Sequence, residues 1–265
     1  MEQALFISKL RNLKYFTKDF TRIYFGQEFC ERLMPDKKKL KNMLSFIDKE
    51  DLNFTFVTPY VTNHGLMKLE PILTFINKKR PGSEIVFNDW GVFQYIKDEC
   101  NELIPVMGRL LNRMKRGPRI MNIFDQLSES TKKYYQSSNL DVPYVEAYLR
   151  DQNIYRVEFD NLLQGLNLNG TDIKIKKSLY LPFAFISTTR FCLSAHCDKL
   201  EYFDYVGIFP CAQECQRYTF NLLNPVMSVP LIRKGNTIFF LNENIPDVVE
   251  KHQIDRIVIQ PEIPI

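Results

Sequence analysis

Short apolar runs alternate along the chain with segments in which apolar residues recur at helical spacing. The apolar runs predict β-strands at residues 22–25, 54–57, 84–87, 104–107, 155–159, 180–186, 218–222, 237–241 and 256–259. Helices are predicted near Cys30, over residues 66–79, after Gly91, over residues 142–150 and over residues 245–252. Apolar strands without alternation are buried on both faces, so the pattern predicts an α/β fold with a largely parallel sheet. It leaves a closed (β/α) TIM-like barrel and an open doubly wound sheet as alternatives.

Length and composition predict a single barrel-sized domain over residues 1–265. The chain is 45% hydrophobic and 25% charged, which suffices for a sizeable core, and no linker or repeat divides it. No window holds the roughly 18 apolar residues of a membrane span, and residues 1–20 lack the apolar stretch of a secretory signal. We therefore expect a cytoplasmic protein without a membrane partner. Thiols stay reduced in that compartment, so clustered cysteines indicate metal binding rather than disulfides.

Four cysteines are candidates for such a site. Cys211 and Cys215 form a C-x3-C pair, Cys192 lies upstream of them, and Cys30 follows the first predicted strand. Thiolates are the usual ligands of iron–sulfur clusters, and four of them complete a cubane. A zinc site is the alternative for the same four residues. Zinc sites usually use two short pairs of ligands, and this chain has one.

Sequence motifs surround these cysteines. Residues 190–194 are R-F-C-L-S and residues 211–217 are C-A-Q-E-C-Q-R; earlier, residues 24–30 are Y-F-G-Q-E-F-C and residues 88–91 are N-D-W-G. Through these motifs most of the chain resembles the collagenase-like peptidase family of unknown catalytic type. That family, marked by R-C-L-x-S followed by C-A-Q-x-C-R, includes proteins of anaerobic ubiquinone hydroxylation and of RNA base hydroxylation.

The chain also departs from the family pattern, by an inserted Phe191 and by Gln216 before Arg217. Other members have a ligand cysteine where this chain has Phe185, which favours Cys30 as the fourth ligand here. The resemblance implies a (β/α) barrel with a [4Fe–4S] cluster at the carboxyl ends of the strands, held by Cys30, Cys192, Cys211 and Cys215.

The resemblance further implies an oxygen-independent, hydroxylase-type redox enzyme that acts on an aromatic small molecule or an RNA base. An organic carboxylate such as prephenate would be the hydroxyl donor. The alternative is a non-catalytic iron–sulfur subunit or redox sensor that forms a heteromer with a homologous barrel protein. We expect no protease activity, because no serine, cysteine or zinc catalytic set is visible. The net charge of +4 neither requires nor excludes nucleic acid, and DNA is not a partner we predict.

Other candidate site residues follow predicted strands, where barrels carry their working side chains. His64 is a candidate proton donor, and the alternative is a loop histidine that caps a helix or faces solvent. Asp89 is a candidate base or orienting group, and the alternative is the cap of the next helix. Arg109 and Arg190 are candidates for binding a substrate carboxylate, because guanidinium groups match carboxylate geometry.

Three further features are not assigned to the main site. Cys100 stands alone in a helical stretch and is predicted to be a small core residue. Cys197 is either another plain thiol or a spare ligand beside the main four. The remaining cations of residues 109–119 are explained by a solvated loop.

Overall fold

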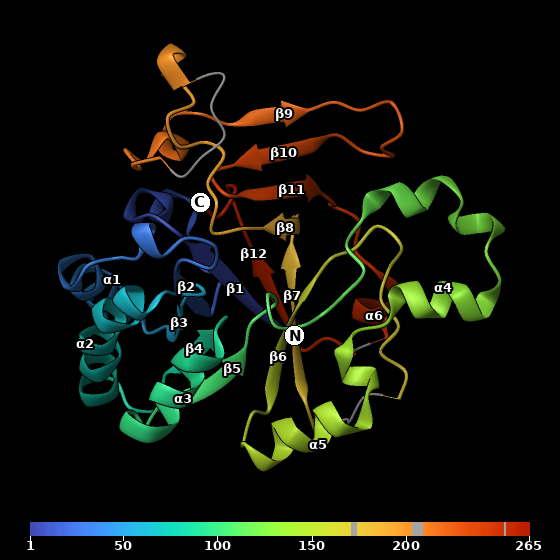
Figure 1. Ribbon diagram of the computed structural model, residues 1–265. Helices are drawn as coiled ribbons and strands as arrows, with labels where there is room; N and C mark the ends of the chain where they lie inside the picture. The colour runs from blue at the N-terminus through green and yellow to red at the C-terminus, as the bar shows by residue number, and fades with distance from the viewer. Residues whose placement is uncertain (171–173, 203–208, 252) are drawn as a thin grey trace.

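Eight parallel strands close into a barrel in the computed structural model, which describes residues 1–170, 174–202, 209–251 and 253–265 (Figure 1). The strands are β1 (Glu2–Ile7), β2 (Arg22–Gly26), β3 (Asn53–Val57), β4 (Glu84–Phe87), β5 (Ile104–Met107), β6 (Arg156–Asp160), β7 (Lys176–Leu181) and β12 (Arg256–Ile259). Their order around the barrel is β1-β12-β7-β6-β5-β4-β3-β2. The predicted α/β barrel is confirmed, and the open sheet is excluded.

Helices lie outside the barrel wall, most regularly beside its first half (Figure 1). The α-helices are α1 (Lys37–Glu50), α2 (Asn63–Lys79), α3 (Trp90–Glu99), α4 (Glu129–Gln136), α5 (Pro143–Asp151) and α6 (Asp247–Glu250). Short 3-10 turns connect the elements at η1 (Leu10–Tyr15), η2 (Glu31–Leu33), η3 (Pro118–Asn122), η4 (Phe124–Gln126), η5 (Asn139–Asp141), η6 (Leu200–Tyr202) and η7 (Glu214–Gln216). None of the helices in the described part of the chain has the length and apolar composition needed to cross a bilayer.

Two predicted helices differ from the structure. An α-helix near Cys30 is wrong: only the 3-10 turn η2 follows it, and α1 begins after Asp36, whose side chain caps the Lys39 N–H at 2.8 Å. The last helix is shorter than predicted: Pro246 is its N-cap, and α6 covers only Asp247–Glu250. Its predicted end, His252, lies outside the described residues.

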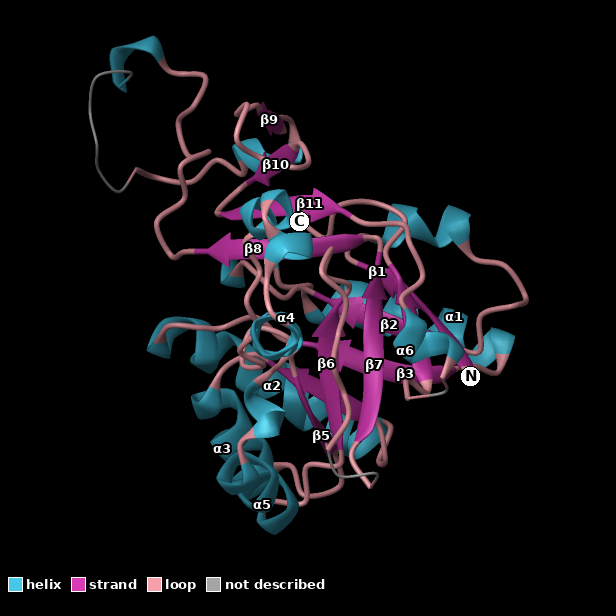
Figure 2. Ribbon diagram, turned by 90° about the vertical axis from the view of Figure 1, so that its right-hand side faces the viewer, coloured by secondary structure: helices cyan, strands magenta, loops and turns pink. Residues whose placement is uncertain are grey.

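A second, antiparallel sheet lies beyond one end of the barrel (Figures 1 and 2). It contains β8 (Phe183–Thr188), β9 (Phe220–Leu222), β10 (Leu231–Lys234) and β11 (Thr237–Leu241), in the order β8-β11-β10-β9. The single strand predicted over residues 180–186 is wrong, because the chain leaves the barrel at Leu181–Pro182, a cis peptide, and continues into the second sheet. Pro182 has no N–H with which to extend the ladder of β7.

The barrel interior contains an ionic network as well as apolar side chains. Small and aromatic residues such as Val57, Val86 and Tyr24 fill part of it. Arg256 donates to the Tyr24 hydroxyl at 2.6 Å and to both oxygens of Glu84 at 2.6 and 3.0 Å. Glu158 accepts from the Tyr24 hydroxyl at 3.0 Å and is fully buried, and burial raises the pKa of Glu158 to about 7.

Candidate functional site

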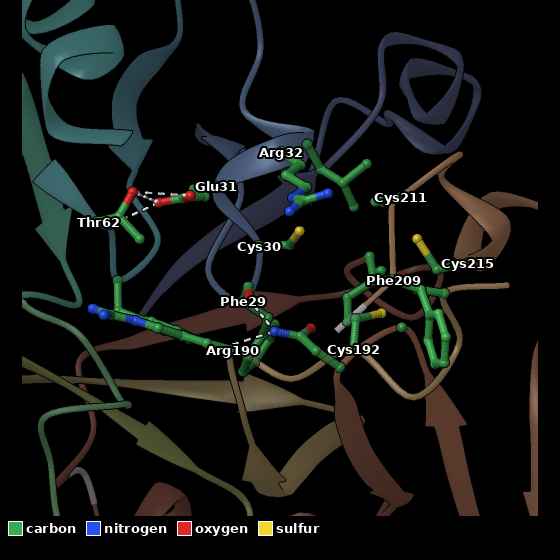
Figure 3. Close-up of a pocket in the computed structure, with 16 residues that line it drawn as sticks. Phe29, Cys30, Glu31, Arg32, Thr62, Arg190, Cys192, Phe209, Cys211 and Cys215 are labelled. Atoms are coloured by element: carbon green, nitrogen blue, oxygen red, sulfur yellow. Dashed lines mark hydrogen bonds between the residues drawn. The ribbon is translucent and has the colours of Figure 1, made fainter. Parts of the chain in front are cut away.

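The four predicted cysteine ligands line one cavity of about 160 Å³. Cys30 lies in the turn after β2, Cys192 follows β8, and Cys211 and Cys215 lie before β9. Figure 3 shows Cys30 on the N-terminal segment at one side of the cavity, with Cys192 and Cys215 on the C-terminal segment across from it. Residues far apart in the sequence therefore meet at one site, which we call the cysteine pocket.

Two sulfurs of the cysteine pocket accept N–H hydrogen bonds: Cys211 Sγ from the Gln213 backbone and Cys215 Sγ from Gln216 Nε2, both at 3.4 Å. The backbone N–H groups of Arg32 near Cys30, and of Ser194 and Ala195 near Cys192, lower the pKa values of those two thiols against the larger effect of burial. Such N–H groups stabilise thiolate charge, and at iron–sulfur clusters they help to set the reduction potential.

The four thiols also interact electrostatically. Burial raises the pKa of Cys30 to about 11, the Arg32 N–H opposes the rise, and the other three thiols add to it. Burial raises the pKa values of Cys192 and Cys215 as well. Four thiolates so placed would repel one another without a positive group between them, and bound iron would supply that group.

The residues present fit a four-iron cubane in donor type and number. Among the described residues, no three His, Cys, Asp or Glu side chains gather closely enough to hold a single metal ion. A cubane needs a different arrangement, because each of its four iron atoms takes one thiolate and the ligands surround a wider space.

A glycine and a buried ion pair position Cys30. Gly26 has φ +145°, and a Cβ there would lie 2.0 Å from the Val57 carbonyl oxygen, so only glycine fits the end of β2. Two residues before Cys30, Glu28 accepts from Arg109 Nε at 3.0 Å and from Arg109 Nη2 at 2.7 Å. The segment that carries Cys30 is therefore anchored inside the barrel.

Buried Glu214 joins the two later cysteine loops. Its Oε1 accepts from the His196 N–H at 3.1 Å, and its Oε2 accepts from the Ala212 N–H at 3.2 Å. Next to this junction, Ser194 Oγ donates to the Gly235 carbonyl at 3.0 Å, and a Cβ on Gly235 would lie 3.3 Å from Cys215 Cβ. The loops of Cys192 and Cys215 are thus held together by protein contacts alone.

Polar and basic residues complete the wall of the cysteine pocket. Arg32 and Arg190 are the cations among its described lining residues. Arg190 donates to the Val61 carbonyl at 2.9 Å and lies 5.8 Å from the centre of the Tyr60 ring. The Tyr60 hydroxyl accepts from Asn236 Nδ2 at 2.8 Å. Guanidinium groups beside an aromatic face suit an anionic aromatic ligand.

The other predicted site residues lie elsewhere or have partners within the protein. His64 is exposed in the first turn of α2 and is not among the lining residues of the cysteine pocket. Asp89 caps α3, accepting from the Gly91 N–H at 2.7 Å, which is the capping role foreseen as its alternative. Cys100 is fully buried in the core, as predicted. Cys197 is exposed and also lies outside the lining.

Arg109 is fully buried and does not line the cysteine pocket. Its Nη1 donates to Asp160 at 2.8 Å, in addition to the two bonds to Glu28. Burial lowers the pKa of Arg109, but the carboxylates of Glu28 and Asp160 raise it overall, so the guanidinium stays charged. The carboxylates it binds here are the protein's own. Sequence reasoning missed Glu28, and its position two residues before Cys30 was the only signal for it.

Comparisons with known proteins give weak structural similarities. No family model and no curated protein matches the chain. The U32 peptidase Mk0906 superposes with a TM-score of 0.47 at 10% identity, over 99% of this chain and 93% of that one. The chitinase TsES1 from Trichuris suis gives 0.37 at 8% identity, over 97% and 91%. Human YKL-39, described as a pseudo-chitinase, gives 0.34 at 10% identity, over 97% and 91%. Matches this distant assign no function to the chain.

Proposed function

We propose that this chain holds a [4Fe–4S] cluster on Cys30, Cys192, Cys211 and Cys215 and is an oxygen-independent, hydroxylase-type redox enzyme. Its substrate would be an aromatic small molecule or an RNA base. The observation that carries the proposal is the convergence of four thiols from distant segments on one cavity, where two of the sulfurs accept N–H hydrogen bonds. The family resemblance of the cysteine motifs supports the same ligand set.

A purely structural role for these cysteines explains less. Cys100 shows what a core cysteine looks like in this protein: it is fully buried among apolar side chains. In the cysteine pocket, by contrast, three of the four thiols are partly exposed, and all four line the same cavity. Partly exposed thiols that share a cavity are accessible to a metal, unlike a core cysteine.

The wall beside the thiols would bind and orient the organic substrate. When bound, the cluster would supply one-electron chemistry. Arg190 and Arg32 would hold a carboxylate, as on a hydroxyl donor such as prephenate, through charge-assisted hydrogen bonds. Tyr60 offers an aromatic face beneath Arg190, and burial raises the pKa of Tyr60, so its hydroxyl stays protonated at neutral pH.

The function is tested by titrating prephenate into protein purified without air, with the visible spectrum and calorimetry as readouts. We expect saturable binding that Arg190→Gln weakens roughly tenfold, because a charge-assisted hydrogen bond is lost. Arg113→Gln is the control, since Arg113 is exposed and does not line the cysteine pocket. Cluster-loaded protein that binds no carboxylate contradicts the enzyme, and would favour a redox subunit that works with a homologous barrel protein.

A further inference from the structure

A second cavity, of about 190 Å³, lies next to the cysteine pocket and shares Arg32 and Leu33 of η2 with it. Its lining includes Lys9, Gln27, Arg32, Lys39, Gln213 and Gln216. We call it the basic cavity. The proposed reaction does not use it.

Three cationic residues from three separate segments line the basic cavity, half-buried Lys9 and exposed Arg32 and Lys39, and no acidic side chain is among its described lining residues. Burial and the nearby charges of Lys234 and Arg11 lower the pKa of Lys9 to about 8, against the smaller opposing effect of Glu262. Lys9 donates to the Ile265 carbonyl at 2.9 Å, and Lys39 Nζ lies 3.9 Å from a carboxylate oxygen of Asp36, which is largely exposed. Positive charge in the cavity is therefore only partly balanced, and an anion there would be stabilised.

One lining residue of the cavity, Gln27, carries a buried acceptor that no described residue hydrogen-bonds. Gln27 is 1% exposed, and its Nε2 donates to the Ser8 carbonyl at 3.1 Å. Its Oε1 is buried and accepts no hydrogen bond from any described residue. A buried acceptor left unpaired is costly, so a ligand that brings a hydrogen to it gains affinity.

We propose that the basic cavity binds a small oxyanion that also carries a hydroxyl hydrogen, of the hydrogen-phosphate or hydroxycarboxylate class. The anionic oxygens would bind Lys9 and Lys39, the two lysines of the lining, and the hydroxyl would donate to Gln27 Oε1. Sulfate has similar shape and charge but offers no hydrogen, so the site distinguishes it from hydrogen phosphate.

The ligand would influence the cysteine pocket through two glutamines that line the basic cavity. Gln216 Nε2 donates to Cys215 Sγ, and the Gln213 backbone donates to Cys211 Sγ, both at 3.4 Å. The Gln213 side chain also donates to the Arg32 carbonyl at 3.4 Å. This part of the proposal rests on the proposed cluster. Negative charge this close to the thiolates disfavours an added electron, so the bound anion lowers the reduction potential.

Binding is tested by calorimetry with inorganic phosphate, sulfate and malate on protein purified without air. We expect phosphate or malate to bind, and sulfate to bind about tenfold more weakly than phosphate because it lacks the hydrogen bond to Gln27. Tighter binding of malate than of phosphate identifies the hydroxycarboxylate source, and the reverse identifies phosphate. Lys39→Gln and Lys9→Gln should each weaken binding roughly threefold to tenfold. Lys38→Gln is the matched control, because Lys38 is an exposed neighbour outside the lining.

Two outcomes overturn the proposal: no heat with phosphate or malate at millimolar concentrations, or unchanged affinity in both Lys9→Gln and Lys39→Gln. The electrostatic link is tested by redox titration of the cluster. Saturating phosphate or malate should lower the reduction potential of the wild type but not that of the double variant Lys9→Gln/Lys39→Gln. An unchanged wild-type potential overturns the link. Protein that binds phosphate but contains no iron would refute the cluster and support the anion site in the basic cavity. Protein that contains iron but binds neither phosphate nor malate would support the cluster and refute the anion site.

Discussion

Replacing Arg109 with Met should destabilise the protein strongly, because Arg109 is the central cation of a fully buried ion network. It binds Glu28 at 3.0 and 2.7 Å and Asp160 at 2.8 Å, and all three side chains are shielded from solvent. Asp160 keeps Arg116 at 2.9 Å, so the unpaired charge falls on Glu28. Removing one partner of a buried pair costs about 3–5 kcal/mol. In a protein of this size that lowers Tm by roughly 6–20 °C.

The loss of unfolding free energy in Arg109→Met should also depend on pH. Burial raises the pKa of Glu28 above its usual value although Arg109 opposes the rise, and without Arg109 it rises further. A carboxyl whose folded-state pKa is raised contributes stability that is fully present below the unfolded pKa of about 4.3. That stability is lost as pH rises through the folded-state pKa. The difference in unfolding free energy between Arg109→Met and wild type should therefore be smaller at pH 5 than at pH 8.

Urea unfolding followed by circular dichroism at both pH values measures this difference. The double variant Arg109→Met/Glu28→Gln should recover part of the loss, because a neutral amide replaces the unpaired carboxylate. Exposed Arg113 provides the control, since Arg113→Met should stay within about 0.5 kcal/mol of wild type. An Arg109→Met variant within about 1 kcal/mol of wild type at pH 8 would refute the role given to Arg109.

Three further substitutions test other parts of the fold and site. Between roughly pH 4.3 and 7, buried Glu158 holds its proton in the folded protein whereas the unfolded chain does not, so the unfolding free energy of the wild type should fall by up to about 1.4 kcal/mol per pH unit. Glu158→Gln should remove this decline. The same pH dependence of the unfolding free energy in wild type and variant, measured by urea unfolding, would argue against it. Gly26→Ala should cost more than about 3 kcal/mol or prevent soluble expression, because its Cβ meets the Val57 carbonyl. Gly117→Ala, which has open space, should be nearly neutral in the same thermal melt, and equal Tm values for the two alanine variants would contradict the clash. Glu31→Gln should cost about 1–2 kcal/mol in urea unfolding, because its carboxylate accepts the N–H that begins α2 at 2.7 Å; an unchanged midpoint would show that this bond contributes nothing.

The parallel α/β sheet could be predicted because strands such as β4 are short apolar runs with no alternation, whereas the closure of that sheet into a barrel was implied by the family resemblance and not by the pattern. Such runs need burial on both faces, and few folds provide it. The second sheet could not be predicted in the same way. Phe183 and Phe185 continue the apolar run of β7, so the apolar pattern hides the break, and Pro182 is the signal in the sequence for the point at which the chain leaves the barrel.

In the cysteine pocket, too, some residues could be predicted from the sequence and others could not. The cysteine motifs singled out four thiols, and the fold brings the distant Cys30 to the same cavity as the other three. The arginines could not be assigned from sequence, because Arg109 and Arg190 both follow strands. The folded barrel shows that Arg109 forms ion pairs with Glu28 and Asp160, whereas Arg190 lines the cavity. Partners distant in sequence decide whether a guanidinium binds the protein or a ligand.

The proposed cluster is tested most directly by the iron and sulfide content of protein purified without air, with zinc measured as a comparison. We expect about four irons and four sulfides per chain, with a broad visible absorbance. Cys30→Ala and Cys211→Ala should both lose them, whereas Cys197→Ala, altered at an exposed thiol outside the pocket lining, should keep them. Wild-type protein that contains no iron and resists reconstitution, or that binds stoichiometric zinc instead, would contradict the account.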